Sequence, residues 1–208
     1  MSTRFYMKRS TKIITFCISI ILLLSATTVV LWIFVFKAET FLYDFETTLD
    51  GWIGDADYLV GENDSIVIDW NVTRKTENPY KGDYSICLEI DGRQDDGAVW
   101  IERAFSVDAD DIDSKYVKVS FYIYSENIGM NIRAHIFASV NTTNPSIEED
   151  FDFKTTTITS DSYLNGWYKF STTVKILPLD QIWVAIGIKV AWETFLKFYI
   201  DNVSVRIG

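Results

Sequence analysis

After Lys37 the chain alternates apolar and polar side chains with a period of two, and this pattern limits the fold most strongly. In the stretch NIRAHIFASV (131–140), every second residue from Ile132 to Val140 is apolar. Successive side chains of a β-strand point to opposite faces, whereas an amphipathic helix repeats every ~3.6 residues. Gly, Asn, Asp and Pro separate these short runs. The pattern predicts an all-β sandwich of two antiparallel sheets.

The runs that follow this pattern predict strands at 41–46, 56–60, 65–72, 84–90, 97–105, 115–125, 130–140, 151–158, 166–176, 181–191 and 196–206. No internal repeat and no low-complexity linker interrupts them, so one domain is expected over residues 40–208. About 170 residues are enough to bury a core without a disulfide. Cys17 and Cys87 are the only cysteines, and Cys87 alternates with apolar neighbours as a strand residue would.

Residues 13–36 contain no charged side chain and form the most hydrophobic run in the chain. As a helix they would be about 36 Å long, enough to span a hydrocarbon core of ~30 Å. The residues before the run are basic and include no acid: Arg4, Lys8, Arg9 and Lys12. This bias predicts a cytoplasmic tail at 1–12, a transmembrane signal anchor at 13–36 and an extracellular domain on a cell membrane.

A cleaved signal peptide is the alternative interpretation of this run. The apolar segment is longer than the ~7–15 residues of a signal-peptide core. Cleavage after Ala38 would also place bulky Phe36 at a position where a small residue is required. These two points favour an uncleaved anchor.

The segment from Lys37 onward is strongly acidic, with 15 basic and 29 acidic residues and a net charge of −14. Such a surface repels nucleic acids and anionic lipids, so no nucleic-acid partner is expected. Four Asn-x-Ser/Thr sequons follow the hydrophobic run, at Asn63, Asn71, Asn141 and Asn202, and glycosylation at the first three would fit an extracellular location.

An aromatic surface is predicted on the side of the central strands opposite the apolar core positions. If those strands are neighbours, eight residues share one outer face: Trp100, Glu102, Tyr122, Tyr124, Arg133, His135, Phe137 and Trp183. A solvated sheet face normally carries small polar and charged residues. An aromatic face is therefore unusual unless a ligand, a partner or another segment covers it.

Three motifs in order resemble a known family. They are Asp44-Phe45-Glu46 with Gly51-Trp52, then Pro79-Tyr80-Lys81-Gly82-Asp83-Tyr84-Ser85, and finally Tyr199-Ile200-Asp201-Asn202-Val203. Together they resemble the galactose-binding-like sandwich, and more narrowly the jelly-roll carbohydrate-binding modules of xylanases and glucanases. The resemblance covers nearly all of 41–206 and implies a jelly-roll fold behind the membrane anchor.

The resemblance also implies a structural calcium ion where the first and last strands meet. It assigns Glu46 and Asp201 as carboxylate ligands, with backbone carbonyls of the loop from Lys81 through Asp83 to Tyr84. Calcium takes 6–8 oxygen ligands, so this set is chemically suitable. The alternative is that both carboxylates are solvated strand-end acids.

In that family, sugars stack on aromatic side chains of a sheet face or bind at loop tips. The resemblance therefore implies that the aromatic face binds a glycan, with Arg133, His135 and Glu102 bonding hydroxyls. Two alternatives remain: the face packs against another protein, or a loop within 141–165 covers it. Trp52 and Trp167 each follow a glycine and are predicted as core residues.

Enzymatic motifs are missing from the sequence. His135 is the only histidine, and no Gly-x-Ser-x-Gly or Cys-x-x-Cys occurs. The acidic cluster at 148–150 follows Pro145 in a predicted loop, where solvated charge is expected. The sequence thus favours non-catalytic glycan binding at a cell surface. A protein–protein assembly module that uses the same aromatic face is the alternative.

Overall fold

The computed structural model describes residues 38–60, 66–93, 97–107, 115–125, 134–151, 166–177 and 179–208, and Glu39–Ile207 form one compact unit. The predicted tail and anchor (1–36), Asn63 and Arg133 lie outside the described residues, as does most of the predicted strand at 151–158. Within the described part of the chain, no helix is long and apolar enough to cross a membrane.

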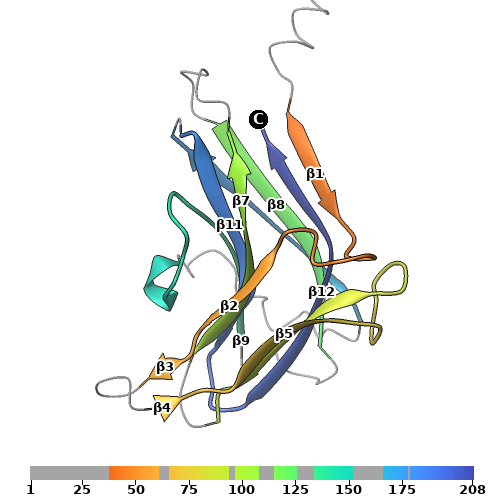
Figure 1. The fold of residues 1–208 in the computed structure, drawn as a ribbon, viewed down its shortest axis with the longest axis vertical. Coiled ribbons are helices and arrows are strands. Elements are labelled where there is room, and N and C mark those ends of the chain that lie inside the picture. The colour runs from red at the N-terminus through yellow and green to blue at the C-terminus, as the bar shows by residue number, and fades with distance from the viewer. Residues whose placement is uncertain are drawn as a thin grey trace, which may run out of the picture. The chain divides into compact units, whose positions relative to one another are not determined.

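The unit is all-β, with two antiparallel sheets packed face to face (Figure 1). The six-stranded sheet has the order β10-β8-β12-β6-β5, and β1 pairs with the last part of β12. Its strands are β1 (Glu39–Tyr43), β5 (Trp70–Lys75), β6 (Ser85–Asp91), β8 (Lys115–Tyr124), β10 (Tyr168–Ile176) and β12 (Phe195–Ile207). The first and last strands therefore meet, as the motif resemblance implies.

The four-stranded sheet has the order β2-β7-β11-β9. Its strands are β2 (Ile53–Asp57), β7 (Ala98–Ser106), β9 (Ala134–Asn141) and β11 (Gln181–Val190). A small ribbon of β3 (Leu59–Val60) and β4 (Ile66–Val67) stands beside it, and the 3-10 turn η2 (Glu148–Asp150) follows β9. An all-β sandwich of two antiparallel sheets, as predicted, is confirmed for the described residues.

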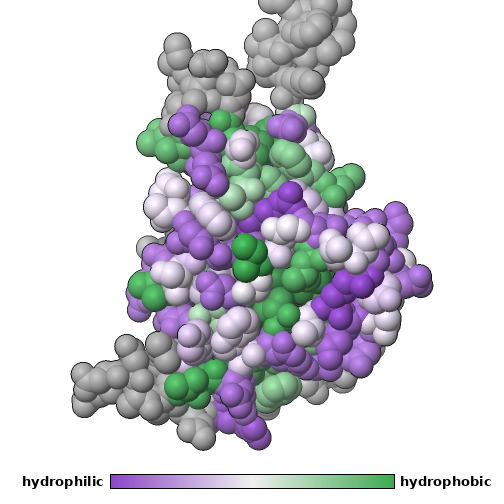
Figure 2. All heavy atoms as spheres, viewed as in Figure 1, coloured by the Kyte–Doolittle hydropathy of each residue, from purple (hydrophilic) through white to green (hydrophobic). Residues whose placement is uncertain are grey.

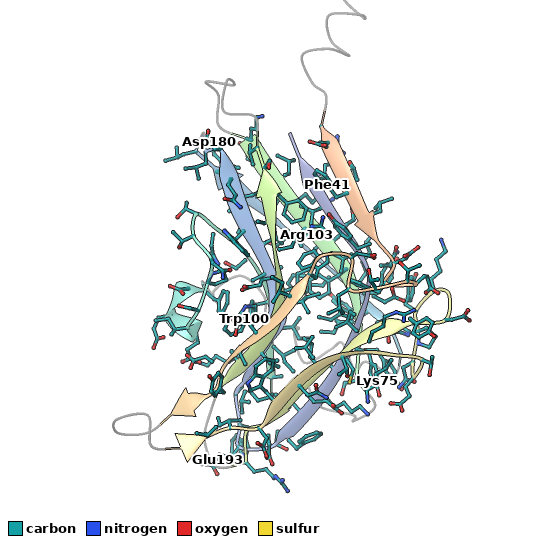
Figure 3. The ribbon with its side chains drawn as sticks, viewed as in Figure 1. Phe41, Lys75, Trp100, Arg103, Asp180 and Glu193 are labelled. Atoms are coloured by element: carbon teal, nitrogen blue, oxygen red, sulfur yellow. The ribbon has the colours of Figure 1, made fainter. Side chains whose placement is uncertain are left out.

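The core lies between the sheets and consists of the predicted inward positions. On β8 these are Val117, Val119, Phe121 and Ile123, all fully buried. Trp52 is also buried, as predicted, and meets Tyr43 edge-on at a centroid distance of 5.6 Å. Arg103 lies over the Tyr43 ring at 4.7 Å and is labelled in Figure 3, together with Trp100 on the opposite face of β7. Period-two alternation thus identifies the core face of each strand.

Three predicted strands differ from the observed ones. The run 56–60 covers the end of β2 and all of β3, and Tyr58 separates the two strands. The run 41–46 stops pairing at Tyr43, because Phe45 has a φ of 59° and turns the chain out of the sheet. The run 65–72 divides at Ile68 and Asp69, where the chain passes from β4 to β5. The Ile68 amide donates to the Tyr58 carbonyl, which fixes this crossing point.

Candidate functional site

The outer face of the four-stranded sheet carries an aromatic cluster that is closed to solvent. Trp100 of β7 and Phe137 of β9 lie opposite Gly187 of β11 and flank it. A Cβ on Gly187 would lie 2.6 Å from the Trp100 Cβ, so only glycine fits between the two rings. Phe151 packs on both rings, at centroid distances of 4.9 Å and 4.5 Å. All three aromatic residues are buried.

Phe151 belongs to a covering segment, residues 142–151, that crosses this face. The Glu148 amide donates to Asp57 Oδ2 on β2 at 3.0 Å. The Glu148 carboxylate pairs with Lys189 Nζ on β11 at 2.7 Å. These contacts join the covering segment to two strands of the sheet. Of the alternatives left by the sequence, loop coverage is therefore the one seen for the Trp100 region.

Glu102 lies beneath the same segment and is buried. Its Oε2 accepts a hydrogen bond from Trp100 Nε1 at 2.7 Å, and the Asn144 side chain bonds it from the covering segment. Burial raises the pKa of Glu102, and the bonds from Trp100 and Asn144 oppose this rise. In this arrangement Glu102 fixes the covering segment to the sheet and has no open side toward a ligand.

His135 and Trp183 lie at the borders of the covered cluster and are both half-buried. His135 is paired with Lys189, whereas Trp183 lies between Ala104 and Asn141. Trp183 and the His135 partner Lys189 are six positions apart on β11, so the two side chains lie toward opposite ends of the face and do not form one binding platform with Trp100.

The predicted single aromatic face is wrong, because its residues belong to two sheets. Tyr122 and Tyr124 lie on β8 in the six-stranded sheet, whereas Trp100, Glu102, His135, Phe137 and Trp183 lie in the four-stranded sheet. Alternation shows which side of a strand faces outward, and strand pairing decides which outward residues become neighbours. The two groups are therefore on opposite outer faces of the sandwich.

Tyr122 and Tyr124 join two further aromatic residues to form a partly open cluster, which we call the aromatic platform: Tyr80, Tyr122, Tyr124 and Trp167. Tyr80 stacks on Tyr122 with centroids 3.6 Å apart and an interplanar angle of 16°. Trp167 lies 5.6 Å from both Tyr80 and Tyr124. Tyr80 is 38% exposed, and the other three rings are half-buried. The predicted core position of Trp167 is wrong.

The loop that carries Tyr80 is fixed by buried polar contacts. The amides of Tyr80 and Lys81 both donate to Asp201 Oδ2, at 2.9 Å and 3.0 Å. Asp201 is fully buried at a bulge in β12, where Asn202 has a φ of 50°. Burial raises the pKa of Asp201, and the three backbone amides that bond it oppose the rise. The loop is thus held in place before any ligand arrives.

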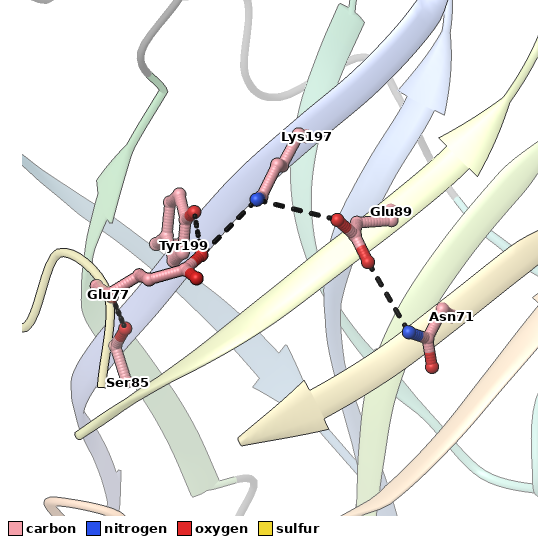
Figure 4. A network of polar contacts seen from close by, with 6 residues as sticks. All are labelled: Asn71, Glu77, Ser85, Glu89, Lys197 and Tyr199. Atoms are coloured by element: carbon pink, nitrogen blue, oxygen red, sulfur yellow. Dashed lines mark hydrogen bonds and ion pairs between the residues drawn. The ribbon is translucent and has the colours of Figure 1, made fainter. Parts of the chain in front are cut away.

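A polar network lies on the same outer face of the six-stranded sheet as the aromatic platform, and Figure 4 shows its contacts. Glu77 accepts from the Tyr199 hydroxyl at 3.1 Å and from Lys197 Nζ at 3.3 Å. These two bonds, the Tyr199 bond first, lower the pKa of Glu77. Lys197 also lies 3.6 Å from Glu89, which accepts from the Asn71 amide at 3.3 Å. The network places the Lys197 amine and the Glu77 carboxylate next to Tyr199, whose ring lies 6.0 Å from that of Tyr124 in the aromatic platform.

The proposed calcium ligands make a different set of contacts. Glu46 accepts from the amides of Asp83 and Tyr84, as Asp201 does from those of Tyr80 and Lys81. A peptide N–H cannot coordinate a cation, so in this geometry the loop presents donors where calcium needs oxygen ligands. Among the described residues, no group of three His, Cys, Asp or Glu side chains surrounds a common point. The arrangement fits a backbone clip and does not fit a calcium shell. The calcium ion that the motif resemblance implies is not tested by these contacts and stays a prediction.

Two predicted glycosylation sites fall on described residues and differ in access. Asn71 is exposed on β5. The amide nitrogen of Asn141, which would carry the glycan, is buried. Cys87 is also buried, in β6 as predicted, and burial raises the pKa of its thiol to about 12. A thiol with so high a pKa is protonated and unreactive at neutral pH.

Tyr80 and Trp167 were missed by the sequence analysis as surface aromatics. Tyr80 lies in a loop, where alternation assigns no face, and Trp167 precedes the first paired residue of β10. Alternation could have identified Trp167 as a surface residue. It is two residues before the exposed Lys169, so both side chains lie on the same outward side of the strand. Strand pairing brings together the Tyr80 loop, β8 and the start of β10, which are far apart in the sequence.

No model of a known protein family matches the chain, and no curated protein matches it. Among solved structures, the CBM22-1 xylan-binding domain of Paenibacillus barcinonensis Xyn10C is 14% identical, with a TM-score of 0.44 over 82% of this chain and 96% of that one. The mannan-recognising module TmCBM27 is 12% identical, with a TM-score of 0.45 over 82% and 98%. Because all these values are low, the ligand is inferred below from this chain's own residues.

Proposed function

We propose that this chain binds a glycan without catalysis, through the aromatic platform, and that residues 13–36 anchor it in a membrane with the sandwich outside. The stacked and partly exposed pair of Tyr80 and Tyr122, with Trp167 beside it, carries the proposal. Flat aromatic rings offer an apolar surface to the C–H face of a sugar, and tyrosine hydroxyls can bond its hydroxyls. The motif order that resembles carbohydrate-binding modules supports the same ligand class.

Preorganisation makes this platform a better candidate than the covered cluster on the other sheet. Two backbone amides hold the Tyr80 loop on Asp201, and Tyr122 belongs to a central part of β8. A ligand would therefore find the rings already in place and lose little affinity to ordering. On the four-stranded sheet, the same ligand would first have to displace Phe151 from Trp100.

The test is glycan binding by the full chain in detergent, measured on a polysaccharide array and then by calorimetry. We expect Tyr80→Ala and Trp167→Ala each to weaken binding roughly tenfold or more, as for a central aromatic contact. Trp192→Ala is the control, because Trp192 is 72% exposed in the turn between β11 and β12 and lies outside the platform. Equal losses for all three variants would contradict the assignment of the site.

If the wild-type chain binds no glycan, the proposed function is wrong. If the wild-type chain then self-associates and Tyr80→Ala abolishes that association, the platform is an assembly surface instead. Sedimentation of the wild type and the variant separates these two results.

A further inference from the structure

A cluster of cations lies beyond the aromatic platform on the same outer face of the six-stranded sheet. Arg206 of β12 is directly opposite Lys118 of β8, and both are exposed. Lys175 of β10 is paired with Tyr116, so it is the diagonal neighbour of Lys118. We call these three residues, Lys118, Lys175 and Arg206, the basic cluster. None of them forms an ion pair with another described residue.

The basic cluster is exceptional within its surroundings. Like charges directly opposite on neighbouring strands are destabilising, and Arg206 faces Lys118 in this way. Among the strand residues that the structure describes, the adjoining outward positions hold no acid: Thr40, Leu42, Tyr116, Ser120, Ser171, Thr173 and Ser204. The segment from Lys37 onward carries a net charge of −14, so acids to balance these cations were abundant. The repulsion is consistent with a site kept for an anionic ligand.

The basic cluster is continuous with the aromatic platform. The outward residues of β8 run from Tyr124 and Tyr122 through Ser120 to Lys118, so about 13 Å of strand separates Tyr122 from Lys118. Ser171 and Ser204 flank Ser120 and add hydroxyls between the two surfaces. Lys169 adds a cation beside the aromatic platform, because it is exposed and its Nζ lies 5.8 Å from the Tyr122 ring centroid.

From this continuity we infer that the ligand is an acidic polysaccharide, whose sugar rings stack on the aromatic platform and whose anionic groups pair with the basic cluster. The inference rests on the proposed glycan binding and names its substrate class. An exposed cation contributes little alone, but several aligned cations act together on a chain of like charges. A neutral glycan would use the platform and gain nothing from Lys118, Lys175 or Arg206.

The experiment compares two uronate polymers, polygalacturonate and alginate, with their methyl-esterified forms, using the full chain in detergent. Esterification removes the charge and keeps the sugar backbone. We expect the free acids to bind at least about tenfold more tightly than the esters, and this difference to shrink as salt rises and screens exposed charges. Equal affinity for acid and ester, insensitive to salt, would overturn the inference and leave glycan binding intact.

Variants separate binding from folding. Arg206→Glu replaces a repelling pair with an attracting one, so the variant should melt no lower than wild type while it binds the acids several-fold more weakly. Lys118→Glu/Arg206→Glu should lose at least about tenfold in affinity. Arg93→Glu makes the same charge change in the turn after β6 and should alter affinity less than twofold.

Two further outcomes show which of the two proposals is wrong. If no polymer, acid or ester, binds the chain, glycan binding itself is wrong. A second outcome is that the wild-type chain binds anionic phospholipid vesicles but no uronate polymer, and that Lys118→Glu/Arg206→Glu abolishes the vesicle binding. In that case the basic cluster binds a membrane surface, and the acidic-glycan inference is overturned.

Discussion

Truncating Phe151 should open the covering segment without unfolding the sandwich. Phe151 is 6% exposed, and burial of such a ring contributes ~2–3 kcal/mol. Its contacts with Trp100 and Phe137 add ~0.5–1.5 kcal/mol each. Phe151→Ala should therefore cost about 3–5 kcal/mol. This cost falls mainly on docking of the segment, because the cluster that Phe151 covers is separate from the main core.

Native-state hydrogen exchange measures the opening. The Glu148 amide is bonded to Asp57 across the covered face at 3.0 Å, so it exchanges only when the segment lifts. A loss of ~3 kcal/mol corresponds to exchange faster by roughly a hundredfold. Core amides of β8 should keep their protection.

Ile147→Ala is the matched control, because Ile147 belongs to the same segment and is 46% exposed. It should leave exchange at Glu148 nearly unchanged. If Phe151→Ala speeds that exchange no more than Ile147→Ala does, the ion pair to Lys189 holds the segment and the packing argument is refuted. A fall in the melting temperature of the whole domain equal to the full cost would also refute it.

Three further measurements test the structure. Burial raises the pKa of Glu102 above its ordinary value of 4.5, so its contribution to stability is complete below that pH and is lost as pH rises through the folded-state pKa. Glu102→Gln should therefore melt higher than wild type at pH 8 and like wild type at pH 4; a constant difference would contradict this. Gly187→Ala should destabilise by ~1–3 kcal/mol in denaturant titration, because its Cβ would lie 2.4 Å from the Val99 carbonyl oxygen; a neutral result would mean that the backbone of β7 moves away at little cost. For calcium, the amide contacts of Glu46 and Asp201 lead us to expect the same melting midpoint with calcium and with chelator; a midpoint raised by calcium would support the ion that the motif resemblance implies.

The residue sequence was sufficient for the core. Val117, Val119 and Phe121 are buried because alternation is a local property of a strand and needs no knowledge of its neighbours. The glycine before Trp52 correctly predicted a core residue, which meets Tyr43 edge-on, whereas the same signal was wrong for Trp167. The end of the first strand was predicted wrongly, because Phe45 turns the chain out of the sheet with a positive φ that a phenylalanine side chain does not favour.

The site could not be derived in this way. Trp100 and Tyr122 have the same outward pattern in the sequence, yet one is sealed beneath Phe151 and the other supports Tyr80. Their difference comes from pairing between strands far apart in the chain and from loops that carry no periodicity. Alternation chose which side chains point outward, and long-range pairing and loop packing decided which of them meet each other and which meet solvent.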